Sequence, residues 1–561
     1  MTDEAKTGAE YVYEALLEAG VEVVVGLPGT QTLPIDRTII ERDEITYVMT
    51  RHETAIPHVA WGYFESGGGL AATLTVPGPG DTNAMHGLKN ALEDCVPLVH
   101  VSADVDPEDR GQKPIHELDP ASFDDAVKAN LNVETPHELS EKAARAVSIA
   151  RTPPYGPVRL GVPSGILEAA FRAPEADVTP ETATFENPGA YAAAADRLSR
   201  AERPVVYVGG GCRHSPAGVE PVRDLVRALD APVVATMKGK GVFPDDDDRF
   251  LGVAASFLPA GGERVLGAAD VVLALGTDFD GVATAGWDLP MGASLVHVNL
   301  DPGEIDATPY AADVAIVDDA GRATERLREA VDPDRTGAWD GAAVGRRVRE
   351  EYRRNLGEMG LLDHTEPART PATLLALREA IPAGAVVTTD IGGFRLWALE
   401  LFEATDPERY VTAGSWAGMG VGLPSALGAA LANPDRPVVS LTGDGGLLMC
   451  LQELHTLAER DLDVTVVVFD NGDYGTISKS DAARAFGDDS PFGWESPDFA
   501  AIAEGFGVPG VDASTPGAAA DAVAAALDQD GPGLVNVEID PEEPSEVDGS
   551  EYESTVTLEH E

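Results

Sequence analysis

The sequence predicts an α/β protein built from three doubly wound domains with parallel sheets. Short apolar, β-branched runs alternate with Ala-, Leu- and Glu-rich helical stretches along the whole 561-residue chain. Two stretches interrupt this alternation: residues 171–189, which are rich in Pro, Thr and acid, and the charged residues 330–370, where a helical connector is expected. We therefore expect domains over residues 1–170, 190–330 and 365–540, followed by an acidic, solvated tail over 541–561.

The composition is strongly acidic, with 95 Asp and Glu against 40 Lys and Arg and a net charge of −55. Nucleic acid and anionic membranes both need clustered positive charge, so neither is an expected partner. The acid is spread along the chain and only eight of the basic residues are lysines. We interpret this as a cytoplasmic enzyme from a high-salt organism, because salt screens self-repulsion. An unusually acidic protein from ordinary salt is the alternative.

Cysteine usage and the start of the chain restrict the compartment. Three scattered cysteines are too few for a disulfide framework or a Cys-based zinc site. The first ten residues have no basic-then-apolar signal pattern, and no apolar run approaches ~18 residues. We expect a soluble intracellular protein.

The most informative stretch lies between Pro437 and Gly475. A buried strand (438–442) enters the glycine-rich turn 443–446, apolar residues then recur at helical spacing over 447–458, and a second buried strand (464–469) follows. This is one βαβ crossover. It places Asp444 and Asn471 at the carboxyl ends of two parallel strands, where open α/β sheets bind ligands.

The residue types in this stretch suit a phosphate and a hard cation. Gly443, Gly445 and Gly446 allow the backbone to approach a phosphate at a helix N-terminus. Asp444, the side-chain oxygen of Asn471 and a carbonyl near Asp473 are oxygen ligands of the kind that Mg²⁺ prefers. Ordinary turns also use Gly, Asp and Asn. The pattern is nevertheless specific, because Asn471 follows Gly443 by 28 positions across an apolar helix and strand.

With this spacing the sequence resembles the thiamine diphosphate (ThDP) enzymes, whose signature is GDG, a spacer of nearly thirty residues, and Asn-Asn. Here Asp470 stands in place of the first Asn, and Asn471 is the second. The resemblance implies that ThDP and Mg²⁺ are the cofactors. It also implies that Asp444, Asn471 and the Asp473 carbonyl hold the ion against the cofactor diphosphate, with Tyr474 beside it.

Two further segments of the third block extend the resemblance. Residues 412–436 resemble the family segment GxMGxGLPxAIGA, which implies that Met419 wedges between the two cofactor rings and that the Ala417 carbonyl accepts from the 4′-amino group. Residues 388–397 resemble the segment that contacts the diphosphate, here through Gly392 and Gly393. Acetolactate synthases carry Gln-His where this chain has Gly393-Phe394.

The first block resembles the domain that binds the cofactor's pyrimidine. Residues 51–55 match the family's RHE motif, so Glu53 is expected to hydrogen-bond the pyrimidine N1′, and burial would raise the pKa of its carboxyl. A surface glutamate is the alternative. Residues 23–30 and 75–104 match further family motifs, which contain Gly29 and Asn83. In this family the first domain of one subunit faces the third domain of another, so a homodimer or homotetramer is implied.

The sequence departs from its nearest subfamily, the acetolactate synthase large subunits, around the second substrate. That subfamily binds a non-redox FAD in the middle domain, for which Gly209–Gly211 and Asp301 are candidates. The motif GxRFDDR, here residues 276–282, lacks both arginines, one for the flavin and one for a substrate carboxylate. Ser480 takes the place of the acceptor-selecting tryptophan. His116 replaces a glutamine and is a candidate acid/base group, or a structural histidine.

These patterns favour a ThDP-dependent enzyme similar to acetolactate synthase. It would decarboxylate a 2-oxo acid such as pyruvate and join the remaining fragment to a second carbonyl. A non-ligating decarboxylase or another ThDP-dependent C–C lyase is the alternative, and a regulatory small subunit is left open. A non-catalytic ThDP-binding homologue is the alternative of another class; the presence of Glu53 argues against it.

Overall fold

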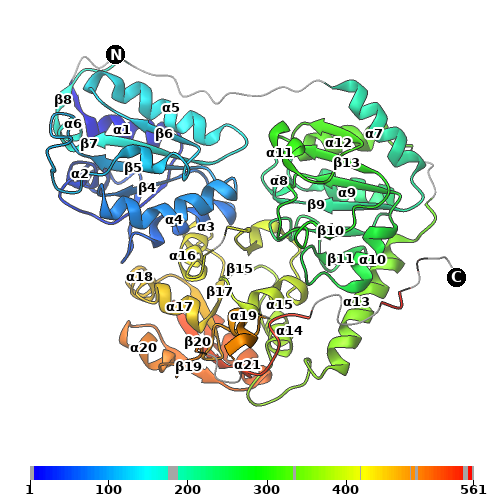
Figure 1. Cartoon of the computed structure of the whole chain (residues 1–561). Helices are drawn as coiled ribbons and strands as arrows, with labels where there is room; N and C mark the ends of the chain where they lie inside the picture. The colour runs from blue at the N-terminus through cyan, green and yellow to red at the C-terminus, as the bar shows by residue number, and fades with distance from the viewer. Residues whose placement is uncertain are drawn as a thin grey trace.

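The structure is a computed structural model of the chain, and it describes residues 5–174, 187–332, 337–416, 418–480, 482–486, 491–547, 554–556 and 558. Three six-stranded sheets, each parallel throughout, confirm the predicted α/β class with three domains. Figure 1 shows the N-terminal domain in blue and cyan, the middle domain in green and the C-terminal domain in yellow to red, each touching the other two near the centre. The central part of the predicted linker, residues 175–186, lies outside the described residues.

The N-terminal domain has the strand order β3-β2-β4-β5-β7-β6. Its central strands are buried on both faces, as parallel strands covered by helices are. The strands are β2 Val23–Gly26, β3 Thr46–Met49, β4 Ala71–Thr75, β5 Leu98–Asp104, β6 Ala129–Asn132 and β7 Pro157–Pro163, with an antiparallel pair β1 Lys6–Thr7 and β8 Ala170–Phe171. The helices are α1 Gly8–Glu18, α2 Leu33–Arg42, α3 Ala55–Glu65, α4 Pro79–Glu93, α5 Leu139–Arg151 and α6 Ser164–Glu168.

The middle domain also has six parallel strands, but its order, β11-β10-β9-β12-β13-β14, differs from that of the N-terminal domain. Its strands are β9 Pro204–Val208, β10 Val233–Ala235, β11 Phe250–Val253, β12 Val271–Leu275, β13 Leu295–Asn299 and β14 Val314–Val317. Its helices are α7 Pro188–Arg200, α8 Gly210–Arg213, α9 Glu220–Leu229, α10 Ala260–Ala268, α11 Pro302–Ala307 and α12 Ala320–Ala330.

The C-terminal domain has the order β16-β15-β17-β18-β20-β19 and follows the connector helix α13 Gly341–Glu358. Its strands are β15 Val386–Thr389, β16 Tyr410–Val411, β17 Val438–Gly443, β18 Val464–Asp470, β19 Gly510–Ala513 and β20 Gly533–Glu538. Its helices are α14 Thr370–Ala380, α15 Gly393–Leu401, α16 Gly422–Ala432, α17 Asp444–Cys450, α18 Glu453–Arg460, α19 Gly475–Ser478, α20 Phe499–Gly505 and α21 Pro516–Leu527. The predicted βαβ crossover is β17, then α17 and α18 in place of one helix, then β18.

The N- and C-terminal domains share one hydrophobic core through the helices α3 and α16. These helices cross where glycines let their backbones touch: a Cβ on Gly428 would lie 2.0 Å from the Val59 carbonyl oxygen, and one on Gly62 would lie 2.3 Å from that of Ser425. Apolar residues of α3, α4, β17 and β18 join the same buried cluster. The two domains are therefore packed as one unit.

A buried ionic cluster ties all three domains together. Glu65 of α3 accepts hydrogen bonds from Lys238 (2.8 Å) and pairs with Arg213 (2.9 Å), both from the middle domain. Asp94 lies 3.5 Å from Lys238 and accepts from the backbone of Gly414 in the C-terminal domain (3.1 Å). Burial alone would raise the pKa of Glu65, but the charges of Arg213 and Lys238 outweigh it and lower that pKa well below its usual range.

The described residues of the C-terminal segment pack in part against the body of the protein, whereas a solvated tail was predicted from residue 541. The Pro544 carbonyl accepts from the Trp397 indole (3.2 Å), and Val547 is buried in the core. Further on, Thr555 donates to Glu351 of α13 (2.7 Å for its backbone N–H). Apolar side chains within the acidic segment supply this packing. Across the described residues, no helix is long and apolar enough to cross a membrane.

Candidate cofactor site

The candidate site is a pocket at the carboxyl edge of the C-terminal sheet. Strand order reverses between β15 and β17, and ligands of open α/β sheets bind at such a switch point. The segments that follow β15, β17 and β18 enclose a cavity of about 250 Å³. Among its lining residues are the predicted Gly392, Gly393, Met419, Gly443, Asp444, Gly445, Gly446, Asn471, Asp473 and Tyr474. Ala417 lies outside the described residues.

Gly445 is where the site demands a residue without a side chain. A Cβ at this position would lie 2.7 Å from Tyr474 Cε1 and 3.0 Å from Met419 Cε. Met419 and Tyr474 therefore converge over the turn that begins α17. Tyr474 is fixed from its other side by an edge-to-face contact with Trp494, at a centroid distance of 4.7 Å.

Oxygen atoms with unmet bonding capacity gather beside this turn. Asp444 is buried and accepts from the Gly472 backbone N–H (2.9 Å). Burial and the nearby charge of Asp470 raise the pKa of Asp444 to about 7. The Asn471 side-chain oxygen accepts from the Asp473 backbone (3.2 Å), and the buried Asp473 Oδ1 has no hydrogen-bond partner within the described part of the chain. A bound cation would offset the electrostatic repulsion among these oxygen atoms.

Asp390 organises the Met419 loop and was not anticipated from the sequence. It follows β15 and is fully buried. Its carboxylate accepts from the backbone N–H groups of Gly420 (2.9 Å) and Gly422 (3.0 Å), which flank Met419 closely in the chain. Burial nonetheless raises its pKa. The only signal in the sequence is an acid directly after an apolar strand.

A second group of predicted residues gathers at the carboxyl edge of the N-terminal sheet, at the switch between β2 and β4. Asn83 donates to Glu53 Oε2 (3.1 Å), and His116 Nδ1 lies 3.3 Å from the Gln31 side-chain nitrogen. Gly29 lies in the turn after β2. None of these residues lines the pocket of the C-terminal domain. In a single chain the predicted site is therefore present as two separate halves.

The loop that carries Glu53 is held by the C-terminal domain of the same chain. Glu453, at the start of α18, is buried and accepts from the backbone N–H groups of Arg51 (2.9 Å) and His52 (3.1 Å). The Glu53 side chain itself is only half-buried. The burial expected of this carboxyl group is therefore incomplete within one chain.

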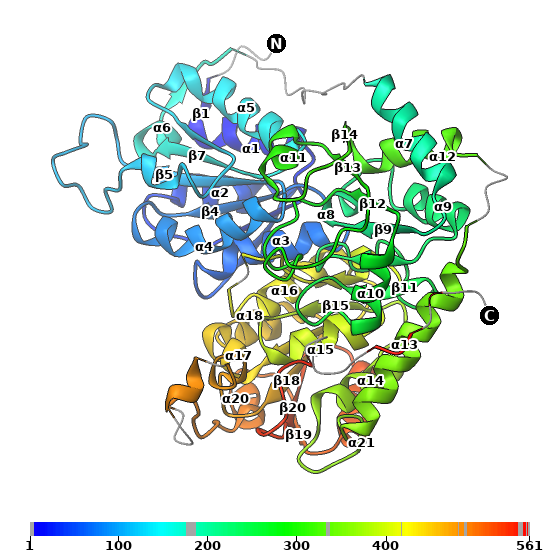
Figure 2. The ribbon, with the colours of Figure 1, turned by 45° about the vertical axis from the view of Figure 1, so that its right-hand side comes forward.

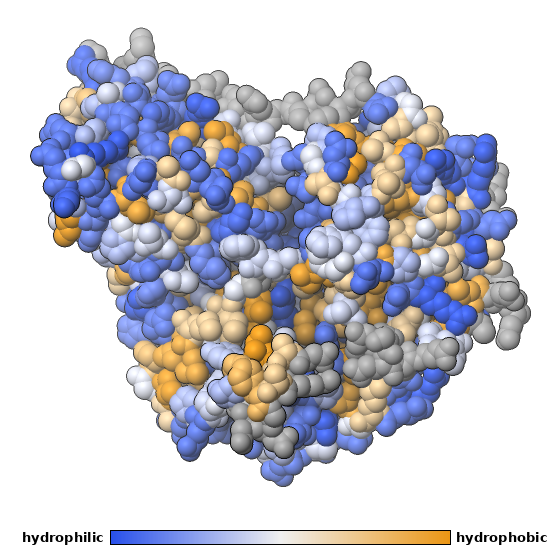
Figure 3. Space-filling model, in the orientation of Figure 1, coloured by the Kyte–Doolittle hydropathy of each residue, from blue (hydrophilic) through white to orange (hydrophobic). Residues whose placement is uncertain are grey.

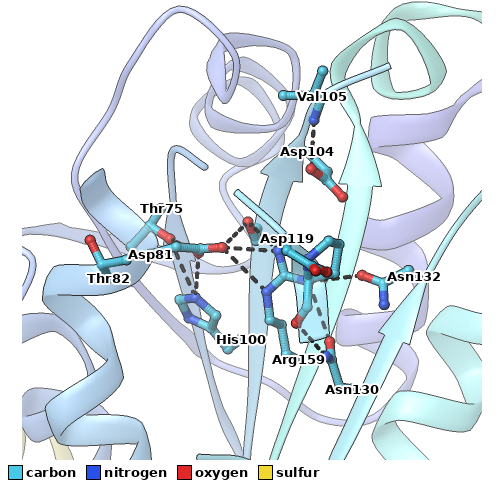
Figure 4. Close-up of polar contacts among 12 residues, drawn as sticks. Thr75, Asp81, Thr82, His100, Asp104, Val105, Asp119, Asn130, Asn132 and Arg159 are labelled. Atoms are coloured by element: carbon cyan, nitrogen blue, oxygen red, sulfur yellow. Dashed lines mark hydrogen bonds and ion pairs between the residues drawn. The ribbon is translucent and has the colours of Figure 1, made fainter. Parts of the chain in front are cut away.

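Figure 4 shows the buried polar network beneath the N-terminal half-site. Asp81, in the first turn of α4, contacts His100 Nε2 (3.0 Å), Ser102 (2.6 Å) and Arg159 (2.9 Å). Burial alone would raise the pKa of Asp81, but the hydrogen bond with His100 and the charge of Arg159 hold it at about 2. The network fixes the turn that presents Asn83 to Glu53. The sequence showed Asp81 only as an acidic residue within the motif GPGDTN and gave no indication of its buried partners.

Comparison with known families agrees with this architecture. Three models of the thiamine pyrophosphate enzymes match the chain in order: the N-terminal TPP binding domain over residues 6–123, the central domain over 191–327 and the C-terminal TPP binding domain over 390–537. The chain belongs to the thiamine pyrophosphate enzyme family; thiamine pyrophosphate is another name for ThDP. It is therefore a ThDP-dependent enzyme by family, as the resemblance predicted.

Its relatives are distant but extend over nearly the full length. The acetolactate synthase large subunit of Parasynechococcus marenigrum is 32% identical over 95% of this chain and 87% of its own length. The acetolactate synthase isozyme 3 large subunit of Escherichia coli is 31% identical over 94% of this chain and 93% of its own. A solved structure reported as a thiamin diphosphate-dependent enzyme from Mycobacterium smegmatis has a TM-score of 0.80 at 23% identity and covers 96% of this chain and 100% of its own, which shows the shared fold.

The residues of the pocket fit ThDP and a hard cation. The orphaned Asp473 oxygen and the clustered acids suit a cation, and the glycine turn lines the pocket with backbone that a diphosphate could approach. No group of three or more His, Cys, Asp or Glu suited to a metal occurs among the described residues, so diphosphate oxygens would have to complete the coordination.

Close backbone packing accounts for two of the glycines that were candidates for binding FAD in the middle domain. A Cβ on Gly209 would lie 2.3 Å from the Gly276 carbonyl oxygen and one on Gly211 would lie 2.9 Å from its Cα, so backbone fills the space that these glycines leave. The adjoining loop presents Asp278, whose pKa is raised by burial and by the charge of Asp280. A dianionic ligand would meet carboxylates there instead of the missing arginines.

Proposed function

We propose that this chain is a ThDP- and Mg²⁺-dependent enzyme that decarboxylates a 2-oxo acid and ligates the product to a second carbonyl compound. The observation that carries the proposal is the pocket itself. It joins Asp444, Asn471 and Asp473 to the glycine turn and Met419 at one edge of one sheet. The distant kinship to acetolactate synthase large subunits supports the choice of substrate class.

Each part of the pocket has a task in this proposal. Asp444, the Asn471 amide oxygen and the carbonyl of Asp473 would hold Mg²⁺, and the backbone of Gly392, Gly393 and 443–446 would hold the diphosphate. Met419, fixed through Asp390, would set the shape of the bound cofactor. When bound, ThDP supplies the electron sink that lets the carboxylate of a 2-oxo acid leave as CO₂.

The half-site of the N-terminal domain would move protons. Glu53 would hold a proton at its carboxyl group, and Asn83 orients that group by donating to its other oxygen. His116, beside Gln31, is the candidate acid/base group facing the substrate. Closure of the pocket around these groups would exclude water.

The separation of the two half-sites supports an assembly of two or more copies. Large apolar side chains are exposed in this domain: Tyr474 and Ile477, which line the pocket, and Trp416, Leu448 and Met449, which precede or belong to the segments that form it. Figure 3 shows hydrophobic surface over the part of the C-terminal domain that carries α17 and α19. Exposed apolar side chains gathered in this way favour an interface with another copy. We propose a homodimer or homotetramer in which Glu53 of one copy meets the pocket of another.

The test is ¹³C NMR of the purified protein in strong salt with ThDP, Mg²⁺ and labelled pyruvate. Formation of acetolactate supports the proposal, and acetaldehyde alone would replace it by simple decarboxylation. Absence of turnover with pyruvate and with longer 2-oxo acids would overturn the proposed reaction. Light scattering in the same buffer would test the assembly; a monomer at micromolar concentration would contradict it.

A further inference from the structure

Lys479 places a positive charge in the pocket. It directly follows α19 and lines the same cavity as Asp444 and Asn471. Its ammonium group donates to the backbone carbonyl of Glu543. Among the described residues it is not part of any ion pair, although the chain is acid-rich. The ammonium therefore keeps bonding capacity for another acceptor, since Lys has three donors.

The ammonium lies at the end of the pocket that holds the predicted metal ligands. A Cβ on Gly475 would lie 3.1 Å from the Asn471 side-chain nitrogen and 3.9 Å from Lys479 Nζ, so both groups border the same small space. An anion bound beside Asn471 would thus lie near this charge.

The opposite segment of the pocket offers no side chain for this purpose. Gly392 and Gly393 have none, and Phe394 is turned into the core, where its ring stacks on Phe469 at 5.1 Å. Arg395 also lines the pocket, but its guanidinium is bonded to Thr412 (3.0 Å) and to the Ala413 carbonyl. Of the cationic residues that line the cavity in the described part of the chain, Arg395 and Lys479, only Lys479 has no side-chain partner.

We propose that Lys479 binds the diphosphate of the cofactor and supplies the side-chain contact that Gly393 and Phe394 cannot make. The inference rests on the proposed function and assigns a residue of this chain to one end of that site. A diphosphate brings several negative charges close to Asp444 and Asp473. A lysine ammonium acts there as a point charge for phosphate oxygens. Burial lowers the pKa of Lys479, a cost that an anionic ligand would offset.

The experiment measures binding of three probes by isothermal titration calorimetry with Mg²⁺: pyrophosphate, ThDP and thiamine. Lys479→Met removes the charge and keeps the length, and Lys479→Arg keeps a charge. Lys142→Met controls for the loss of a half-buried lysine away from the pocket, since Lys142 lies on α5 and pairs with Glu138. We expect Lys479→Met to weaken pyrophosphate and ThDP at least tenfold and thiamine less than twofold, with Lys479→Arg recovering most of the loss.

Two results would overturn the inference. Equal weakening of all three probes would mean that Lys479 only holds the Glu543 segment in place. Unchanged pyrophosphate and ThDP affinity with a raised KM for the 2-oxo acid would assign the charge to a substrate carboxylate. Failure of the wild-type protein to bind ThDP would instead contradict the proposed function. Binding without turnover would contradict only the reaction and leave the role of Lys479 decided by the calorimetry.

Discussion

Glu53 and Asp444 differ in their surroundings. Asp444 is buried among oxygens, whereas Glu53 is half-buried and held by Asn83. Asp444 and Asn471 could be predicted because their spacing around a strand and a helix is visible in the sequence. Asp390 and Asp81 could not, because their donors lie far along the chain: Gly422 for Asp390 and Arg159 for Asp81. An acid near a turn is indistinguishable from a surface acid until those donors are placed.

Glu53→Gln should abolish most turnover while leaving cofactor binding intact. The amide keeps the size and can still contact Asn83, but it has no carboxyl proton to give. Acid–base groups typically contribute 10²–10⁴-fold in rate, so a loss of at least ~100-fold in kcat is expected, with the Kd for ThDP changed less than threefold. Steady-state kinetics and calorimetry provide the two readouts. Glu18→Gln, on the exposed end of α1, is the control, and wild-type turnover in Glu53→Gln would exclude the assigned role.

Glu543→Gln should alter the pH dependence of stability. Burial raises the pKa of Glu543 from 4.5 to about 7, although the Thr370 backbone donates to it. Between these values the folded state keeps the proton and the unfolded state loses it, so wild-type stability falls as pH rises through this window. Glutamine has no such proton. The variant should gain up to ~3 kcal/mol relative to wild type between pH 4.5 and 8.

The measurement is urea unfolding at several pH values in constant salt. Glu542→Gln is the matched control, since its side chain is exposed one residue away, and its difference from wild type should not vary with pH. A Glu543→Gln difference that is equally flat would contradict the buried, protonated carboxyl.

Among the secondary-structure elements, the βαβ crossover from β17 to β18 was predictable because its apolar runs and glycine turn are local signals. The break between α17 and α18 was not. The spacing of Leu447, Leu451 and Leu454 favoured one helix, but α18 starts afresh at Glu453. That turn places Glu453 against the backbone of Arg51 and His52, in another domain. The packing of the C-terminal segment also could not be predicted, because its partners on α13 and α15 lie far away in the sequence.

The crossing of α3 and α16 should tolerate no added side chain. In Gly428→Ala the new Cβ would approach the Val59 carbonyl to 2.0 Å, so the helices must separate. Overpacking of this kind typically costs ~1–3 kcal/mol. Gly357→Ala is the matched control, because nothing lies within 4 Å of that position on α13 and alanine favours a helix by up to ~1 kcal/mol.

Differential scanning calorimetry should therefore show a lower Tm for Gly428→Ala and an equal or higher Tm for Gly357→Ala. Equal Tm values for wild type and Gly428→Ala would mean that the crossing is loosely packed. That result would conflict with the core shared by the two domains.

For the molecule as a whole, the net charge of −55 is the dominant electrostatic fact. Self-repulsion of this size destabilises a compact state, and salt shortens the Debye length from ~10 Å at 0.1 M to ~3 Å at 1 M. We expect the Tm followed by circular dichroism to rise steeply with KCl concentration up to the molar range. Replacing KCl by tetramethylammonium chloride at equal ionic strength separates screening from specific ion effects. Full stability in dilute buffer would refute adaptation to salt.

The architecture of three sheets was predictable from alternation alone, whereas the way the domains are joined was not. Figure 2, turned by 45° from the first view, again shows α3 and α16 side by side where the blue and yellow parts of the chain meet. Glycine contacts and buried ion pairs between segments hundreds of residues apart form these junctions. Neither leaves a periodic pattern in the sequence.

The crossing of α3 and α16 also bears on how the chain is made. Ribosomes add ~5–20 residues per second, and α16 follows α3 by several hundred residues. During synthesis the apolar face of α3 therefore stays uncovered for tens of seconds before α16 is made. Over that interval the nascent N-terminal domain exposes the apolar face of α3 to solvent. Holdase chaperones bind surfaces of this kind. The yield of folded protein should therefore depend on such chaperones. It should also depend on the elongation rate through the middle domain, more strongly than the stability of the folded protein alone predicts.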